Sequence, residues 1–355
     1  MYCKKFGELV QGICTTSLKR DGAASRRRVF SWTSVCQRRT LLLNRRAYPA
    51  VQLRPVPNHV SLSYTCRACY ASQSTVDPDE VKKFQALASK WWDEQGEFAA
   101  LHSMNDLRVP FIRDNLMSVH GVRHPGKPLA GLRILDMGCG GGLLTEPLGR
   151  LGADVLGIDP AANSIGTAEL HTFRDPELQG RVTYRACTLE ELSQGLEGEG
   201  GEVGEGEEES FDAVVASEVV EHLADLDTFA LCCGHVLKPG GSLFITTISK
   251  TNLSYALAIV AAERVLGIVP SGTHDWDKFI TPVDLERLLE SNGFSVESIQ
   301  GMQYNPVSAG WSWTQSTSVN YALHAVKRKE EPPPGHTQTG PAHTGGRDAP
   351  PSGHN

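Results

Sequence analysis

Several features that would mark whole classes of protein are missing from this sequence. The nine cysteines follow no repeated spacing, and Cys66 and Cys69 form a lone CxxC, so neither a disulfide framework nor a zinc ribbon is predicted. No apolar segment of the secretory type precedes a small-residue cleavage site, which argues against export. Cys139, Cys232 and Cys233 stand where small apolar residues would serve, and we expect them to be buried free thiols.

Most of the chain also lacks basic charge. Thirteen of the 34 Lys/Arg residues but only two of the 41 Asp/Glu residues lie within the first 75 positions, which leaves 21 bases against 39 acids in the remainder. Binding to a nucleic-acid backbone needs clustered Lys/Arg, so that class is excluded for the main body. Residues 1–75 are rich in Arg, Ser and Thr, which predicts a mitochondrial transit peptide. A disordered basic arm that binds nucleic acid or membrane is the alternative.

The main body alternates strand-like and helical segments. Asp77 and Pro78 begin a helix as N-cap and first helical residue, and a second helix is expected from about Asp106 to His120. Five short β-branched or apolar runs then alternate with helical stretches, at 133–137, 154–159, 181–186, 211–217 and 242–249. This alternation predicts βαβ units and a parallel sheet with helices on both faces.

The last part of the main body predicts antiparallel strands at one edge of the sheet. Thr281 and Pro282 begin another capped helix, and strand-like runs follow at 294–300 and 320–326. A late pair of strands suggests an antiparallel edge on the parallel sheet. We therefore expect an α/β fold of the Rossmann-like type with a mostly parallel sheet of seven strands, spanning residues 77–328.

Two segments have the composition of unstructured chain. Residues 190–209 are rich in Glu and Gly and contain no base, so we expect a disordered, solvated insertion between two strands. The tail over residues 329–355 is rich in Pro, Gly, His and Thr, and its histidines are too sparse for a metal-binding tract. Both segments are expected to lie outside the core.

A glycine-rich segment follows the first predicted strand. Asp136 precedes it, and Gly138 and Gly140 fall within the run Asp-Met-Gly-Cys-Gly-Gly-Gly. Glycines at such a turn permit positive φ and let backbone N–H groups approach a ligand. Asp159 ends the next strand, where a carboxylate can accept hydrogen bonds from both ribose hydroxyls of an adenine nucleoside.

Two details favour S-adenosylmethionine over a dinucleotide as the ligand of this loop. The third glycine of the dinucleotide motif would fall at Leu143, so that motif fails. The carboxylate of Asp136 would repel a pyrophosphate, but it suits the ammonium of a methionine moiety and a sulfonium. The arrangement resembles that of class I methyltransferases.

A cluster of ionisable residues follows the fourth predicted strand. If Glu218 to His222 are helical, Glu218, Glu221 and His222 share one face at the carboxyl end of the sheet. They could hold a divalent ion that lowers the pKa of a bound catechol. Alternatively, His222 acts alone as a general base, or the acids are a solvated helix start.

Motifs spread over the main body together resemble one family, the ubiquinone biosynthesis O-methyltransferases. They are Lys90-Trp91-Trp92-Asp93, Gly96-Glu97-Phe98, Asn105-Asp106-Leu107-Arg108, Asp136-Met137-Gly138-Cys139-Gly140-Gly141-Gly142, Glu218-Val219-Val220-Glu221-His222 and Gly272-Thr273-His274-Asp275. The likeness runs from about Asp77 to Lys327, and the basic leader makes it similar to the mitochondrial form.

The resemblance implies an enzyme that methylates two hydroxyls, one on a polyprenyl dihydroxybenzoate and one on demethylubiquinol. It implies S-adenosylmethionine contacts at Arg108, Gly138, Asp159 and Ser217, the last through its backbone. Arg108 suits the methionine carboxylate. It also implies that Mg²⁺, or another divalent ion, is bound by Glu218, Glu221 and His222, with His222 and Glu218 catalytic.

The same resemblance implies a peripheral enzyme on the matrix side of the mitochondrial inner membrane, within a complex of biosynthetic enzymes. Residues 253–262 are strongly apolar, but Glu263 and Arg264 interrupt the run before it reaches spanning length. We therefore expect residues 253–269 either to lie at the membrane interface or to form a core helix. Rival functions are methylation of another small phenol or amine, and a non-catalytic S-adenosylmethionine-binding scaffold.

Overall fold

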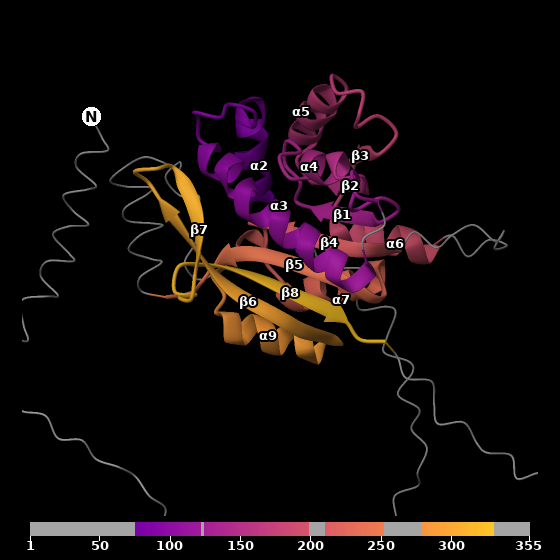
Figure 1. The fold of residues 1–355 in the computed structure, drawn as a ribbon, viewed down its shortest axis with the longest axis vertical. Coiled ribbons are helices and arrows are strands. Elements are labelled where there is room, and N and C mark those ends of the chain that lie inside the picture. Colours follow the sequence, from indigo (N-terminus) through magenta and orange to yellow (C-terminus); the bar gives the residue numbers. More distant parts are fainter. Residues whose placement is uncertain (1–74, 122–123, 199–209, 252–277, 330–355) are drawn as a thin grey trace, which may run out of the picture.

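The computed structural model describes residues 75–121, 124–198, 210–251 and 278–329. These residues build one sheet with the strand order β3-β2-β1-β4-β5-β8-β6-β7. Neighbours from β3 to β5 are parallel, whereas β8 is antiparallel to both β5 and β6, and β7 is antiparallel to β6. The predicted Rossmann-like architecture with an antiparallel edge is confirmed (Figure 1).

The sheet has eight strands, so the expected number of seven is wrong. The strands are β1 (Arg133–Met137), β2 (Asp154–Ile158), β3 (Val182–Arg185), β4 (Phe211–Ser217), β5 (Leu237–Ile248), β6 (Phe294–Asn305), β7 (Gly310–Thr314) and β8 (Asn320–Lys327). The additional strand is β7, which pairs with the end of β6 from Gly301 to Asn305. Its sequence alternates Trp311, Ser312 and Trp313, but the run is only five residues long and none of its side chains is fully buried, so it gives only a weak strand signal.

Helices cover both faces of the sheet. They are α2 (Pro78–Leu87), η2 (Ala88–Lys90), α3 (Ala99–His120), α4 (Thr145–Arg150), α5 (Ala162–Thr172), α6 (Leu189–Gly198), η3 (Val220–His222), α7 (Leu226–Val236) and α9 (Pro282–Ser291). Alternate residues of β4 belong to different core clusters: Val214 packs with residues of α7 and α9, and Val215 packs with residues of α3 and α4. Helix α3 begins seven residues before its expected start.

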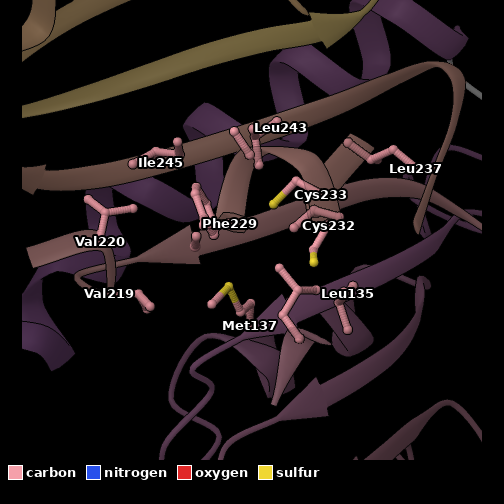
Figure 2. Close-up of a cluster of buried hydrophobic side chains, with 14 of the residues drawn as sticks. Leu135, Met137, Val219, Val220, Phe229, Cys232, Cys233, Leu237, Leu243 and Ile245 are labelled. Atoms are coloured by element: carbon pink, nitrogen blue, oxygen red, sulfur yellow. The ribbon is translucent and has the colours of Figure 1, made fainter. Parts of the chain in front are cut away.

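The predicted buried thiols are confirmed. Cys232 and Cys233 of α7 lie in the core cluster beside Phe229, and Figure 2 shows them among side chains of β1, β5 and the loop after β4. Cys139 is also buried and free. All three therefore behave as small apolar residues, and burial raises the pKa of the Cys139 and Cys233 thiols.

The expectation of disorder over residues 190–209 is wrong for its first part, because residues 190–198 belong to α6. Leu189 and Leu192 lie one helical turn apart and are both buried in the core. Glu190 is buried as well, and its carboxylate accepts a hydrogen bond from the backbone N–H of Thr75. Burial of this apolar stripe stabilises the helix despite its acidic composition; residues 199–209 lie outside the described residues.

Two predicted helix starts are confirmed by their caps. The Asp77 carboxylate accepts a hydrogen bond from Asp79 N (3.0 Å) at the start of α2, and Thr281 Oγ1 accepts one from Asp284 N (3.2 Å) at the start of α9. Thr75, assigned to the leader by composition, is buried, and its carbonyl accepts from Ala224 N at 2.8 Å.

Most of the remaining predictions concern residues that lie outside the described part of the chain. Residues 1–74 of the predicted leader, the segment 253–269 and most of the predicted tail lie outside the described residues. In the parts of the chain that the structure describes, no helix is both long and apolar enough to cross a membrane.

Candidate active site

The glycine loop lies at the carboxyl ends of β1 and β2. Gly138 (φ +67°) and Gly140 (φ +53°) both adopt conformations that favour glycine. A Cβ on Gly138 would lie 2.6 Å from Val219 Cγ2, so no larger residue fits there without a shift. The Gly138 and Cys139 N–H groups donate to Ile158 O at 2.8 and 3.0 Å, which fixes the loop against β2.

Asp159 joins the loop to the end of β2. One carboxylate oxygen accepts from Gly140 N at 3.1 Å, and the other accepts from Ala161 N at 2.7 Å. Burial raises the pKa of Asp159 to about 6, although both backbone hydrogen bonds act in the opposite direction. A half-buried carboxylate held in this way can accept hydrogen bonds from the hydroxyls of a nucleoside.

Asp136 lies beside the loop at the end of β1 and is almost fully buried. It accepts a hydrogen bond from Thr145 Oγ1 at 2.6 Å. Burial raises its pKa to about 6, and the negative charge of Asp159 adds to the increase, whereas the bond from Thr145 and the charge of Arg108 oppose it. The pocket therefore contains two carboxylates whose ionised forms are destabilised until a cation arrives.

Arg108 reaches the same pocket from α3. Its Nη1 donates to Ser217 Oγ at 2.9 Å, and its Nε donates to Asn105 Oδ1 at 2.7 Å. Burial lowers the pKa of Arg108 to about 10, although the charges of Asp136 and Glu218 counteract this effect. Ser217 thus engages Arg108 through its side chain, whereas only a backbone contact to the cofactor was expected from it.

The residues after β4 do not form the α-helix on which the Glu218–Glu221–His222 face was predicted. Glu218 has φ +57°, and the following turn is the short 3₁₀ helix η3. The strained residue turns the chain sharply at the end of the strand. The three side chains nevertheless line the same cavity, and the charge of Glu221 raises the pKa of both Glu218 and His222.

Glu221 is buried and Glu218 is half-buried, and their carboxylate oxygens have different surroundings. Glu221 Oε2 accepts from Thr247 Oγ1 at 2.8 Å. Glu218 Oε1 is buried without a hydrogen-bond partner among the described residues. Burial, reinforced by the charge of Glu221, raises the pKa of Glu218.

His222 interacts with Glu80, a residue that the sequence placed only in the first turn of the helix predicted after Asp77. Its Nδ1 lies 3.1 Å from Glu80 Oε2, and Phe84 packs edge-on against the imidazole ring. Burial alone would lower the pKa of His222, but the hydrogen bond to Glu80 and the neighbouring carboxylates raise it. The capping residues gave no indication of this pairing, because it joins positions 142 residues apart.

The donor types of the cluster suit a divalent cation, but a ligand set is not assembled. Two carboxylates and one imidazole are common metal ligands, and the unpartnered Glu218 Oε1 is an acceptor that a cation would satisfy. Within the described residues, however, no three His, Cys, Asp or Glu side chains are grouped closely enough to hold an ion. Metal ligation by Glu218, Glu221 and His222 therefore stays a prediction.

Aromatic side chains from the segment after α2 cover the glycine loop, a feature to which the sequence assigned no role. Trp91 stacks on Phe98 with ring centroids 3.9 Å apart, and its Nε1 donates to Ser164 Oγ at 3.1 Å. Trp92 Nε1 donates to Gly141 O at 2.9 Å. The N-terminal segment thus forms one wall of the pocket.

These parts surround a single cavity of about 990 Å³. Eight of the nine predicted site residues line it, namely Arg108, Asp136, Gly138, Asp159, Ser217, Glu218, Glu221 and His222. Gly140 is not part of the lining, and its N–H bonds to Asp159 instead. The cavity continues to the β6–β7 hairpin, where Met302, Val307 and Trp311 line it.

Comparisons with known proteins agree with this geometry. A family described as a methyltransferase domain matches residues 112–299. The mitochondrial ubiquinone biosynthesis O-methyltransferase of Homo sapiens is 60% identical over 263 residues, which covers 74% of this chain and 68% of that protein. The ubiquinone biosynthesis O-methyltransferase of Azorhizobium caulinodans is 45% identical over 258 residues, covering 71% of this chain and 94% of the relative.

Solved structures show only a distant likeness. A magnesium protoporphyrin IX methyltransferase from Synechocystis with bound S-adenosylmethionine matches with a TM-score of 0.44 at 16% identity, covering 72% of this chain and all of that one. The assignment therefore comes from sequence relatives and the matched domain. This chain is an S-adenosylmethionine-dependent methyltransferase that belongs to the family of ubiquinone biosynthesis O-methyltransferases.

Proposed function

We propose that this enzyme methylates a catechol oxygen in ubiquinone biosynthesis, on a polyprenyl dihydroxybenzoate and on demethylubiquinol. One observation carries the proposal: the glycine loop with Asp159 and the cluster of Glu218, Glu221 and His222 line the same cavity. A nucleoside held at the loop therefore shares one space with an oxygen activated at the cluster. The relatives' names supply the pathway.

The proposed cofactor contacts follow from the charges in the pocket. Asp159 accepts the ribose hydroxyls, and Arg108 faces the methionine carboxylate, for which it exchanges its bond to Ser217. Asp136 lies where a cation would offset the cost of its burial, which suits the methionine ammonium. Gly138 lines the cavity, and Gly140 holds Asp159 in place.

The proposed reaction is a displacement at carbon. The catechol oxygen gives its proton to His222 and then attacks the methyl carbon of the sulfonium. The new C–O bond forms as the S–CH₃ bond breaks, and the bonding pair stays on sulfur, which leaves neutral S-adenosylhomocysteine. Glu221 is buried beside this oxygen, and a substrate that fills the cavity would displace water from it, which keeps the oxygen anion reactive.

Glu218, Glu221 and His222 are also proposed to hold Mg²⁺ or another divalent ion. The support is the donor chemistry and the orphaned oxygen of Glu218. A bound ion would supply one effect, namely a lower pKa of the catechol hydroxyl. Both carboxylates would have to leave their present contacts or reorient, because the described residues do not form a ready ligand set.

A prenylated substrate fits the apolar part of the cavity. Beyond the cluster, the apolar lining residues are Ile248, Met302, Pro306, Val307, Trp311 and Val319, and polar residues of the β6–β7 hairpin and its surroundings, among them Gln303, Asn305 and Ser312, line the cavity beside them. Val307 is 69% exposed, so this end of the cavity opens to the surrounding medium. We infer that the tail leaves the active site along the β6–β7 hairpin and stays in contact with a membrane.

The same reasoning suggests a location. The mitochondrial relatives and the basic leader favour a mitochondrial enzyme with a transit peptide over residues 1–75, and a bilayer-bound tail favours a peripheral enzyme on the matrix side of the inner membrane. Membership of a complex of biosynthetic enzymes follows from the family resemblance alone.

Turnover with and without a chelator tests the proposal. Purified protein is incubated with labelled S-adenosylmethionine and a prenylated catechol, before and after EDTA treatment. We expect EDTA to abolish turnover and Mg²⁺ to restore it. Unchanged turnover in EDTA would assign oxygen activation to His222 alone, and absence of turnover under all conditions would reject the catechol as substrate.

Replacing the proposed base tests the same site from the protein side. The variant His222→Ala is expected to lower kcat by roughly a hundredfold or more while the Kd for S-adenosylmethionine stays near that of the wild type, because His222 acts on the oxygen. Stopped-time assays and calorimetry measure the two quantities. A normal kcat in this variant would contradict the role given to His222.

A further inference from the structure

Helix α2 carries a half-buried carboxylate that pairs with the candidate base. Glu80 lies in the first turn of α2, and its Oε2 is 3.1 Å from His222 Nδ1. The side chains of Glu80 and His222 are only 13% and 16% exposed. The other oxygen of Glu80, Oε1, accepts from Lys83 Nζ at 2.7 Å. Each carboxylate oxygen therefore has its own donor, which fixes the orientation of the group.

A second residue of α2 contacts the same imidazole. Phe84 lies one helical turn after Glu80, and its ring meets the His222 ring edge-on with centroids 5.2 Å apart at 85°. The helix thus places a carboxylate and an aromatic ring around His222 from one of its faces. The hydrogen bond sets the position of Nδ1, and the aromatic contact restricts rotation of the ring.

The position of α2 relative to His222 is itself held by the chain just before the helix. Val76 forms an antiparallel bridge with Leu223, and Ala224 N donates to Thr75 O at 2.8 Å. Asp77 pairs with Lys278 at 2.8 Å. The segment that carries Glu80 is therefore attached directly to the two residues that follow His222.

We propose that Glu80 is a positioning residue for His222. It accepts the Nδ1–H bond, so the neutral imidazole keeps its proton on Nδ1 and presents the lone pair of Nε2 to the cavity. No hydrogen bond to Nε2 comes from the described residues, and both Glu80 and His222 line the cavity. The role rests on the proposed function, because it matters for catalysis only if His222 acts on the substrate oxygen or on a metal ion.

Asp79 provides a matched control in the same turn. Its carboxylate pairs with Lys82 at 2.9 Å in the i, i+3 arrangement that Glu80 forms with Lys83, but the Asp79 side chain is 82% exposed. Asp79→Ala and Glu80→Ala therefore each remove one acid and one ion pair from the first turn of α2. Only Glu80→Ala removes a contact to His222.

The test combines kinetics with nuclear magnetic resonance of the full-length enzyme. The ¹⁵N shifts of the ring nitrogens of His222, assigned by their loss in His222→Asn, report which nitrogen carries the proton. We expect Glu80→Ala to mix the two tautomers and to lower kcat roughly tenfold to a hundredfold with little change in the Kd for S-adenosylmethionine. Glu80→Gln, which keeps an acceptor oxygen, should restore part of both effects, and Asp79→Ala should match the wild type.

The outcomes separate this inference from the proposed function. If Glu80→Ala keeps the wild-type tautomer and the kcat of Asp79→Ala, the positioning role is rejected. If Glu80→Ala unfolds, Glu80→Gln decides, because a Gln variant that mixes the two tautomers and still keeps the wild-type kcat would reject the role. A fully active His222→Ala would reject the proposed chemistry, whereas the tautomer of the wild type would still report whether Glu80 orients the ring.

Discussion

At the scale of single residues, the pocket is built from polar groups whose burial is costly until a ligand is bound. Asp136 and Asp159 have pKa values raised to about 6, and the pKa of Arg108 is lowered to about 10, in each case because burial disfavours the charged form. A bound zwitterionic ligand would supply a partner for each charge. Burial of these groups therefore lowers the stability of the ligand-free enzyme, and binding of the ligand relieves this cost.

Asp159 is the residue from which we expect the clearest loss of cofactor binding. Asp159→Ala removes the acceptor for the ribose hydroxyls and for Gly140 N, so the Kd for S-adenosylhomocysteine should rise by roughly tenfold to a hundredfold, or about 1.5–3 kcal/mol. Calorimetric titration measures it. The control is Asp154→Ala at the exposed start of β2, which should bind normally; equal affinity of both variants would contradict the assignment.

Replacing Asp136 is expected to raise the stability of the ligand-free enzyme and to weaken its binding of S-adenosylmethionine. The raised pKa means that the folded enzyme retains a proton which the unfolded chain releases between about pH 4 and 6, so the cost of burying the charge is absent below this window and grows as pH rises through it. At pH 7.5 without cofactor, the free energy of unfolding of Asp136→Asn should therefore exceed that of the wild type by about 2–3 kcal/mol, and its urea midpoint should be higher. This gain in stability should vanish near pH 4.

The same variant should bind S-adenosylmethionine more weakly, because an amide offers the ammonium no charge. Urea unfolding at several pH values and calorimetry give the two results. A stability gain that does not depend on pH would show that the burial of the Asp136 charge is not its source.

At the scale of elements, the glycine loop and the segment after α2 form one packed unit. A Cβ on Gly140 would overlap the indole ring of Trp91, and Gly140 also has positive φ. The loop conformation and the position of the tryptophan are therefore coupled through direct contact. A substitution that shifts the glycine loop should therefore also shift Trp91 and the adjoining α2 and η2, and the reverse should hold as well.

A double-mutant cycle tests this coupling. Gly140→Ala should destabilise the enzyme, and the cost should be smaller by about 1–3 kcal/mol when Trp91→Ala is also present, because the overlap is removed and only the φ penalty is left. Urea unfolding measures all four proteins. Gly166→Ala is the control, since a Cβ there meets no atom within 4 Å; additive costs for Gly140 and Trp91 would contradict direct contact.

At the scale of the whole molecule, the strand order determines where the cavity leads. Strand β8 inserts between β5 and β6, so the β6–β7 hairpin lies at the far edge of the sheet (Figure 1). Residues of this hairpin complete the cavity wall. The parallel half of the sheet thus carries the proposed nucleoside site, whereas the antiparallel half lines the proposed exit for the tail. Substrate specificity is expected to depend on the second half.

An acidic residue at the exit should discriminate between substrates with and without a tail. We expect Val307→Asp to reduce kcat/KM for a prenylated catechol roughly fivefold to thirtyfold while leaving the same catechol without its tail unaffected, because a charge opposes only the apolar chain. Val283→Asp on α9, also exposed but outside the cavity lining, is the matched control. Equal losses with both substrates would contradict the exit path.

The sequence by itself determined the parallel half of the sheet, the glycine loop and Asp159, because each depends on local order: a strand, a turn that needs glycine, and an acid at the next strand end. It also placed eight cavity-lining residues in the predicted site. Residues 190–198 were misjudged because composition hid a buried stripe at Leu189 and Leu192, and β7 was missed because its strand conformation depends on pairing with β6.

Only the tertiary structure decided the pairing of Glu80 with His222, the cover of Trp91 on the loop and the place of Val307 in the cavity lining. In each of these, the contact joins segments that are distant along the chain. Local patterns report which face a residue buries, but not which partner meets it there. That choice is made when the sheet and its helices pack together.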